Sequence, residues 1–351
     1  TLQALAKISK NIIKNYNGKV IAITGSNGKT TTTSIIASTL SDSSSTIANF
    51  NNEIGLPLSI FNSSPKSKYL VYEIGASKFN DINYLSDILK PDIGVITNIG
   101  LSHLESLKNI QGVLKVKSEI INNIKKNGFL IVPDDDKEHL QHWKNIRSDI
   151  KLLTFGLKES SDFHPLEPSL KTNGLYFLVK SIYLEKIIKI NSKLEGNHNI
   201  LNILASCAVH YCLSQDINEF AKKIKSLIFK NSRLTKIKWI KNSILIDDTY
   251  NANPDSARKS IDLLSNHDNK TYFILGDMLE LGNYQKKYHK EIGQYAKLKG
   301  IDVFLGFGNL AKHAVDGFGN NGIFFDTEDE LKNYLKQNIS KKDVILIKGS
   351  R

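Results

Sequence analysis

The chain has few of the residues and segments that would place it in a membrane, an oxidising compartment or a disulfide-rich fold. Only two of its 351 residues are cysteines, Cys207 and Cys212, and their spacing does not place both on one helical face. No apolar run approaches the roughly 18 residues that span a bilayer. Thr1 to Lys14 also lacks the continuous apolar core of a signal peptide. We therefore expect no disulfide framework, no membrane insertion and a location in the reducing cytoplasm.

A dense basic block is also absent, although the formal net charge is +12, from 47 basic and 35 acidic residues. A charge of this size could indicate binding to nucleic acid, to an acidic lipid surface or to a phosphorylated substrate. The lysines, however, are scattered among Asn and Ile along the whole chain. This distribution favours a general compositional bias over a specific polyanion, so we expect no nucleic-acid partner.

Short apolar runs alternate with amphipathic stretches between Lys19 and Val132. Continuous apolar runs are typical of strands buried on both faces of a parallel sheet, and the helix-like stretches between them indicate α/β architecture. Ser169–Asn191 instead predicts an antiparallel insertion, because turn residues separate two β-forming stretches. The predicted strands are Val20–Ile23, Tyr69–Tyr72, Ile93–Ile96 and Phe129–Val132, and the predicted helices are Thr31–Leu40, Asp81–Leu89, Val113–Ile124, Asn199–Ser214 and Ile217–Phe229.

The α/β alternation restarts after Arg233, and a chain of 351 residues is long enough for two domains. We predict a P-loop mononucleotide-binding central domain with a mostly parallel sheet in residues 1–232. A Rossmann-like α/β domain would follow in residues 233–351. Its predicted strands are Ile244–Asp247, Thr271–Leu275, Val303–Leu305, Ile323–Phe325 and Val344–Ile347.

A candidate phosphate loop runs from Thr24 to Thr31, in the order Thr-Gly-Ser-Asn-Gly-Lys-Thr-Thr. It follows an apolar strand and opens a helix, so backbone N–H groups at the helix start would point at phosphates. Lys29 would neutralise phosphate charge and the Thr30 hydroxyl would ligate Mg²⁺. Only two residues separate Gly25 from Gly28, so the pattern is not a full Walker A sequence, and a glycine turn that merely caps a helix is the alternative.

Three further polar residues follow in this region. Glu73 ends a predicted strand, where a carboxylate would enter the crevice in which parallel sheets bind ligands and could hold Mg²⁺. His103 lies after the next strand, and a single histidine in a loop is more often structural than a metal ligand. Lys117 lies on a predicted helix, where a charged side chain ordinarily faces solvent.

These residues belong to a longer series of segments: Thr24–Thr31, Glu73–Ala76, Thr97–Ile99 with His103, and Gly196–Asn199 with Asn202. Their order and spacing resemble those of the Mur ligase superfamily over essentially the whole chain. Further motifs narrow the resemblance to the branch that joins D-alanyl-D-alanine to UDP-N-acetylmuramoyl-tripeptide in peptidoglycan precursor synthesis. These motifs are Asn51–Pro57, Asp247–Pro254, Leu275–Gly282 and Ile347–Arg351.

The resemblance implies an ATP-dependent amide ligase. It also implies roles for the residues of this chain that match the family's motifs. The substrate carboxylate would be activated as an acyl phosphate with ATP and two Mg²⁺ ions, and the enzyme would be a monomer. The implied catalytic residues are Lys29, His103, Lys117 and Arg233. Lys117 would be carbamylated and would bind metal together with Thr30, Glu73 and His103.

The same resemblance implies the contacts of the substrates. Nucleotide would be bound by Gly25, Ser26, Asn27, Gly28, Lys29, Thr30, Thr31, His198, Asn199, Asn202, Arg233, Asp248 and Asn251. The peptide substrates would be bound by Asn52, Asn253, Lys348, Ser350 and Arg351. The second-domain motifs are rich in turn-forming residues, so turn chemistry is the alternative for each of them. The base that takes the proton of the amine is not readable from the sequence, and His289 is a weak candidate.

Members of this superfamily ordinarily carry a further N-terminal domain that binds the uridine nucleotide. The predicted phosphate-loop strand begins near Lys19, so we expect the chain to be a piece of a longer protein. We also expect this piece by itself to bind the uridine-linked substrate poorly. Rival functions are another amino acid ligase of the superfamily, a P-loop ATPase stimulated by nucleic acid, and a regulatory fragment without catalysis.

Overall fold

The computed structural model describes residues 1–171, 174–227 and 234–350. Among these, the residues of Thr1–Gly100 and Asn109–Ile228 form one compact unit, and those of Leu101–Lys108 and Phe229–Arg351 form a second. The short segment around His103 therefore packs with the second unit, although the chain on both sides of it belongs to the first. The predicted boundary at residue 232 stays a prediction, because it falls outside the described residues.

The first unit is built on one large sheet whose described strands have the order β2-β3-β1-β4-β5-β6-β7-β8-β9. The pairs from β2 to β7 are parallel, and β7, β8 and β9 pair antiparallel. The strands are β1 (Lys19–Thr24), β2 (Ser43–Ser45), β3 (Tyr69–Glu73), β4 (Ile93–Ile96), β5 (Phe129–Pro133), β6 (Lys151–Phe155), β7 (Phe163–Lys171), β8 (Gly174–Ser181) and β9 (Ile188–Ser192).

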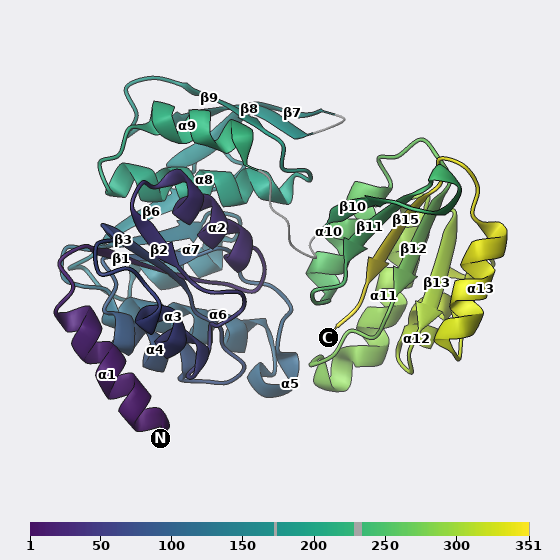
Figure 1. The fold of residues 1–351 in the computed structure, drawn as a ribbon, viewed down its shortest axis with the longest axis horizontal. Coiled ribbons are helices and arrows are strands. Elements are labelled where there is room, and N and C mark those ends of the chain that lie inside the picture. Colours follow the sequence, from purple (N-terminus) through teal and green to yellow (C-terminus); the bar gives the residue numbers. More distant parts are fainter. Residues whose placement is uncertain (172–173, 228–233, 351) are drawn as a thin grey trace. The chain divides into compact units, whose positions relative to one another are not determined.

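Helices cover both faces of this sheet. Figure 1 shows α2 and α8 on one face and α3, α4 and α6 on the other. The parallel strands β1, β3, β4 and β5 are buried on both sides, which explains their continuous apolar sequences. The helices are α1 (Leu2–Lys14), α2 (Lys29–Thr39), α3 (Gly55–Phe61), α4 (Asp81–Leu89), α6 (Ile110–Ser118), the 3₁₀ helix η1 (Glu119–Asn123), α7 (Lys137–Lys144), α8 (His198–Cys212) and α9 (Ile217–Ser226).

The strand order places a topological switch point at the end of β1. The chain leaves β1 toward β3 on one side and later returns to β4 on the other, so β1 is a topological switch point. In open α/β sheets, ligands bind at the carboxyl ends of the strands beside such a point. Parallel register places Ile23 beside Glu73 and Thr24 beside Ile96. The segments that follow these strands therefore meet at one edge of the sheet.

The second unit contains a sheet of order β10-β11-β15-β12-β13-β14, parallel except for the β10–β11 pair. Its strands are β10 (Thr235–Lys238), β11 (Ile244–Asp248), β12 (Thr271–Leu275), β13 (Val303–Phe307), β14 (Gly322–Phe325) and β15 (Val344–Lys348). Its helices are α5 (Leu104–Leu107), η2 (Ile240–Asn242), α10 (Pro254–Leu264), η3 (Gly282–Tyr284), α11 (Gln285–Leu298), α12 (Ala311–Phe318) and α13 (Glu328–Asn338).

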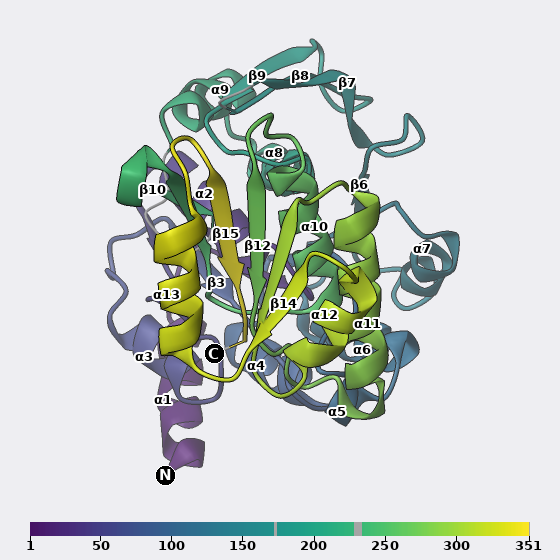
Figure 2. The same ribbon diagram turned by 90° about the vertical axis from the view of Figure 1, so that its right-hand side faces the viewer.

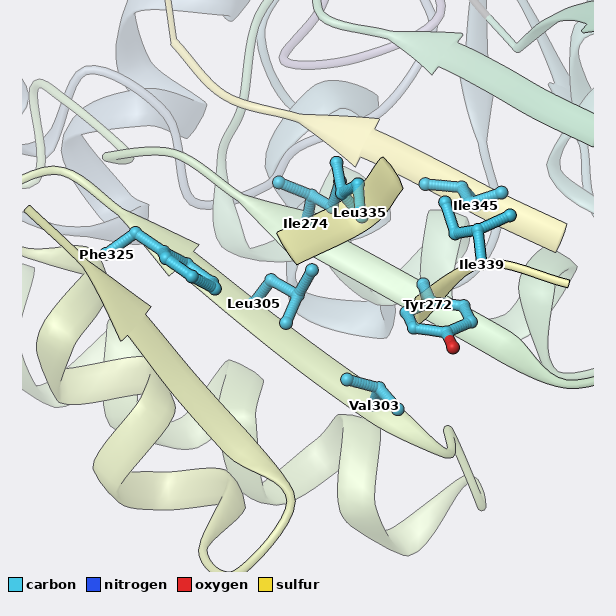
Figure 3. Packing of buried hydrophobic residues seen from close by; sticks show 8 residues of the cluster. All are labelled: Tyr272, Ile274, Val303, Leu305, Phe325, Leu335, Ile339 and Ile345. Carbon is cyan, nitrogen blue, oxygen red and sulfur yellow. The ribbon is translucent and has the colours of Figure 1, made fainter. Parts of the chain in front are cut away.

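Figure 2 shows this sheet between α13 on one face and α10, α11 and α12 on the other. The core on the α13 side is a buried apolar cluster, in which side chains of the central strands pack against the helix (Figure 3). Trp239 packs against the same cluster. The cluster consists of Tyr272, Ile274, Val303, Leu305, Phe325, Leu335, Ile339 and Ile345.

The observed elements confirm the predicted α/β class and the predicted antiparallel insertion. Among the predicted helices, the segment Val113–Ile124 is divided into α6 and η1. A 3₁₀ turn of this kind commonly tightens the end of an α-helix. No helix in the described ranges is long and apolar enough to cross a bilayer.

A buried histidine in the first unit makes its stability depend on pH. The side chain of His210 lies against Phe220 and is almost inaccessible, and this burial lowers its pKa from 6.5 to about 4. Because the unfolded chain takes up the proton first, the stabilisation is complete above pH 6.5 and is lost as the pH falls toward 4. We expect the free energy of unfolding to lose roughly 3 kcal/mol over this range.

The measurement is urea unfolding followed by Trp143, which is buried in the first unit, in a Trp239→Phe background. His210→Phe should flatten the pH dependence of the unfolding free energy. Exchange of His313, which lies in the second unit, should leave that dependence unchanged. An identical pH dependence in His210→Phe and the unsubstituted protein would contradict the assignment.

Candidate nucleotide and metal site

The loop between β1 and α2 has a conformation that requires its glycines. Gly25 and Gly28 have φ values of 142° and 81°, which other residues rarely adopt. A Cβ atom would lie 2.0 Å from the Thr97 hydroxyl at Gly25 and 2.5 Å from the Asn202 amide oxygen at Gly28. The sequence therefore places glycine at the two positions where neighbouring side chains approach the backbone.

The start of α2 offers backbone donors to an anion. Gly28 is the N-cap, and no side chain caps the helix there. The backbone N–H groups at a helix start and the helix dipole both favour phosphate. The loop before it is held by Asn98, whose carbonyl accepts from Ser26 N at 3.1 Å and whose amide oxygen accepts from Asn27 N at 2.8 Å. Lys29 Nζ lies over the loop and donates to Gly25 O at 2.8 Å.

Thr30 and Glu73 form the candidate magnesium pair. The Thr30 hydroxyl donates to Glu73 Oε2 at 2.7 Å, and only 3% of Glu73 is exposed. The pair joins the first turn of α2 to the end of β3, and Thr31 follows in the same turn. Hydroxyl and carboxylate oxygens are the ligands that Mg²⁺ prefers. The described residues contain no cluster of three or more His, Cys, Asp or Glu, so a metal here would need oxygens from a bound phosphate or water as well.

Lys117 is buried rather than solvated. Its exposure is 1%, and it lies in the last turn of α6. Burial lowers its pKa from 10.5 to about 7, and the nearby charge of Lys29 acts in the same direction, against the carboxylates of Asp81, Glu119 and Glu73. The side chain is therefore a partly neutral amine close to the phosphate loop. Lys115, in contrast, is exposed.

His103 packs within the second unit. It precedes α5 with a φ of 52°, and its Nδ1 lies 2.7 Å from Glu280 Oε2. The contact with His103 lowers the pKa of Glu280. The same segment is held by Leu101 N, which donates to Asp255 Oδ2 at 2.8 Å, and by Glu105 N, which donates to Glu280 O. The structure thus gives His103 a carboxylate partner that sequence reasoning did not predict.

The start of α8 lies against the phosphate loop. Asn202 Oδ1 accepts from Thr32 Oγ1 at 3.3 Å, and its Nδ2 donates to Asn199 Oδ1 at 2.8 Å. Asn199 also donates to Glu195 O at 2.7 Å. His198 is the first residue of the same helix and is partly exposed. The structure therefore brings the predicted asparagines to the phosphate loop.

In the second unit, Asp248 and Lys348 end two neighbouring parallel strands and form a buried ion pair. Lys348 Nζ lies 2.6 Å from Asp248 Oδ2 and also donates to Asn251 O at 3.0 Å. The hydroxyl of Ser260 donates to the same carboxylate oxygen at 2.7 Å. Two residues predicted to face different ligands are therefore partners of each other.

The remaining predicted substrate residues have local structural contacts. Asn253 is the N-cap of α10 in a capping box with Ser256. Ser350 Oγ accepts from Leu279 N at 3.0 Å and donates to Ala252 O. The exposed Asn52 accepts at 2.8 Å from the backbone N of Gly55, the first residue of α3. Arg233 and Arg351 lie outside the described residues.

His289 has a structural position. It is completely buried, its Nε2 accepts from Met278 N at 2.9 Å, and its Nδ1 lies 2.6 Å from Gln285 O. Both ring nitrogens thus contact the backbone, and burial lowers the pKa of the ring. This arrangement argues against His289 as the base for the amine.

Sequence reasoning missed two asparagines of the site. Asn98 holds the phosphate loop, and Asn51 Nδ2 donates to Glu73 Oε1 at 2.8 Å. Both lie inside motifs noted above, and Asn51 is directly beside Asn52, which was given a role. The position of Asn98 after a strand that borders β1 was the available signal, because such positions meet at the switch point.

A cavity of about 700 Å³ lies at the opposite ends of the strands and is separate from this site. Its lining includes Lys19 and Tyr69, which begin β1 and β3, whereas the phosphate loop and Glu73 follow or end these strands.

Comparison with known proteins shows which families and proteins this chain is similar to. Residues 23–210 match the model of the Mur ligase middle domain, and residues 232–351 match that of the Mur ligase, glutamate ligase domain. The UDP-N-acetylmuramoyl-tripeptide–D-alanyl-D-alanine ligase of Buchnera aphidicola subsp. Baizongia pistaciae is 34% identical over 355 residues, which cover 100% of this chain and 76% of the relative.

Two solved structures are similar over the whole chain. MurF from Acinetobacter baumannii has a TM-score of 0.91 at 28% identity, and 78% of that chain is covered. MurF ligase from Thermotoga maritima in complex with ADP has a TM-score of 0.88 at 28% identity, and 80% of that chain is covered.

Proposed function

Because the chain belongs to the Mur ligase family, we propose that it is the ATP-dependent ligase that joins D-alanyl-D-alanine to UDP-N-acetylmuramoyl-tripeptide. The observation that carries this function is the contact of Thr30 with the buried Glu73 at the phosphate loop. It combines the positions for a nucleotide phosphate and for a metal ion at one switch point. The substrates are inferred from the Buchnera relative, which has this specificity and matches the chain over its full length.

The residues present fit ATP and Mg²⁺. Gly25 and Gly28 give the loop the backbone conformation and the close packing that it needs, the start of α2 supplies backbone donors, and Lys29 supplies a positive charge. Thr30 and Glu73 supply the oxygen donors that Mg²⁺ prefers. When bound, Mg²⁺ would neutralise phosphate charge. Asn199, Asn202 and His198 would border the adenine.

The reaction requires an activated carboxylate, because a free carboxylate reacts with an amine too slowly. The γ-phosphoryl group of ATP would pass to the terminal carboxylate of the tripeptide and release ADP. The amine of D-alanyl-D-alanine would then attack the acyl phosphate, form the amide and expel phosphate. Lys29 and Arg233 would hold the phosphates in line for this transfer, so the work of the protein is positioning and charge neutralisation.

The second unit would supply the remaining contacts. Asp248 and Asn251 would border the nucleotide, and Asn253 and Ser350 would border the dipeptide, with Lys348 and Arg351 near its carboxylate. Asn52 would face the muramoyl peptide. His103 would complete the positions for two Mg²⁺ ions. The expectations of a monomer, a cytoplasmic location and no nucleic-acid partner stay predictions.

Lys117 would act as its carbamate. A free ammonium would repel a nearby cation, whereas the neutral amine can add to CO₂, form an N–C bond and release one proton. The resulting anion has two oxygen atoms, which suit the hard Mg²⁺ ion. Burial supports this assignment because a desolvated lysine loses its proton readily, and the side chain of Lys117 is 1% exposed.

Phosphate release in the presence of ATP and Mg²⁺ tests the function. We expect release only when UDP-N-acetylmuramoyl-tripeptide and D-alanyl-D-alanine are both present, with the tripeptide offered in forms that differ in the third residue. Glutamate and single amino acids should not replace the dipeptide, and DNA or RNA should not stimulate release. Release driven by glutamate or by nucleic acid would overturn the proposal.

A further inference from the structure

The loop between β2 and α3 contacts Glu73 from two directions. Thr46 Oγ1 accepts a hydrogen bond from Glu73 N at 2.7 Å, and Asn51 Nδ2 donates to Glu73 Oε1 at 2.8 Å. The backbone of Asn51 is fixed as well, because its carbonyl accepts from Gly75 N at 2.8 Å. Asn51 is thus attached to the end of β3 by both its side chain and its main chain.

The two oxygen atoms of Glu73 have different partners. Oε2 accepts from the Thr30 hydroxyl, and Oε1 accepts from the Asn51 amide. A carboxylate with a donor on only one oxygen can rotate about its last bond, whereas a donor on each oxygen fixes the plane of the group. Asn51 therefore determines which oxygen of Glu73 faces the first turn of α2.

Residue 75 has no side chain where the Asn51 amide lies. A Cβ atom at Gly75 would be 2.9 Å from Asn51 Oδ1 and 3.1 Å from its Cγ. Substitution by alanine would therefore push the amide without removing any group that contacts Glu73. The chain thus offers two independent ways to disturb the same hydrogen bond.

We propose that Asn51 is a positioning residue of the magnesium site, whose amide orients Glu73 toward Thr30 and the nucleotide phosphates. This inference rests on the proposed function, in which Glu73 binds magnesium. Substitution of a residue that hydrogen-bonds to a metal ligand typically lowers metal affinity by 10- to 100-fold. Asn51 touches neither the metal nor the phosphates in this scheme, so its loss should weaken the metal dependence of nucleotide binding and leave binding without metal unchanged.

The experiment measures ADP affinity by calorimetry as a function of Mg²⁺ concentration, and again in EDTA. In Asn51→Leu, which keeps the size but removes the donor, the Mg²⁺ concentration for half-maximal effect should rise about 10-fold. Gly75→Ala should shift it in the same direction by less. The affinity in EDTA should match that of the unsubstituted protein, and far-ultraviolet circular dichroism should confirm the fold.

Ser59→Ala is the matched control. Its hydroxyl accepts from Ile47 N at 3.2 Å and so holds the same loop without touching Glu73. We expect its Mg²⁺ dependence to be unchanged. An unaltered Mg²⁺ dependence in Asn51→Leu, or an equal loss of affinity in EDTA, would overturn the positioning role alone. If the unsubstituted protein bound ADP without any dependence on Mg²⁺, the proposed function would fail together with it.

Discussion

Lys117→Ala should lower the kcat of ligation roughly 100- to 1000-fold, the range expected when a group that places charge at the reacting phosphates is lost. The side chain is buried, and burial lowers its pKa to about 7, so near neutral pH a large fraction of the amine is available for CO₂. Without the carbamate, a metal position would lose an oxygen ligand. A small carboxylate such as formate, added at high concentration, should restore part of the activity because it can occupy the vacated space.

Lys115→Ala is the matched control for this substitution. Lys115 lies two residues earlier in α6, faces solvent, and has its Nζ 5.8 Å from the centre of the Phe79 ring. The Lys115→Ala substitution should not reduce kcat, and formate should not change the activity of this variant. The carbamate can also be observed directly, since ¹³C-labelled bicarbonate should give one carbamate signal that is absent from Lys117→Ala. Normal activity in Lys117→Ala with loss in Lys115→Ala would refute the assignment.

The strands were largely predictable because their side chains are buried on both faces and leave continuous apolar runs. β4 and β12 have their predicted bounds, and β1 and β3 extend only by one residue or two. β2 was missed because its three serines carry no apolar signal, and it forms only through pairing with β3. The order of the strands was not predictable either, since it depends on pairing between segments far apart in the chain.

The same distinction holds for the site: its local features could be predicted from the sequence, and its long-range contacts could not. The phosphate loop is local, so its glycines and its following helix are visible in eight consecutive residues. The burial of Lys117 is not visible, because a lysine between a valine and a serine reads as solvated until the neighbouring elements are in place. The pairing of Asp248 with Lys348 spans 100 residues and follows only from the register of β11 and β15.

Lys348→Met should destabilise the second unit by about 3–5 kcal/mol, which is the usual cost of removing one partner of a buried ion pair. Lys348 is 2% exposed, and its removal would leave the Asp248 carboxylate buried with the Ser260 hydroxyl as its described donor. The contact with Asn251 O, which holds the loop after β11, would be lost as well. Trp239 fluorescence during urea unfolding, in a Trp143→Phe background, measures the change.

The double substitution Lys348→Met with Asp248→Leu separates stability from chemistry. Replacing both charges by apolar side chains removes the uncompensated carboxylate, so most of the lost free energy of unfolding should return. If the pair served only the fold, this variant would also regain ligation. We expect it to fold and yet to ligate poorly, because Asp248 and Lys348 are proposed to border the nucleotide and the dipeptide. A double variant as unstable as Lys348→Met would contradict the ion-pair argument, and full activity in a stable double variant would exclude both residues from substrate binding.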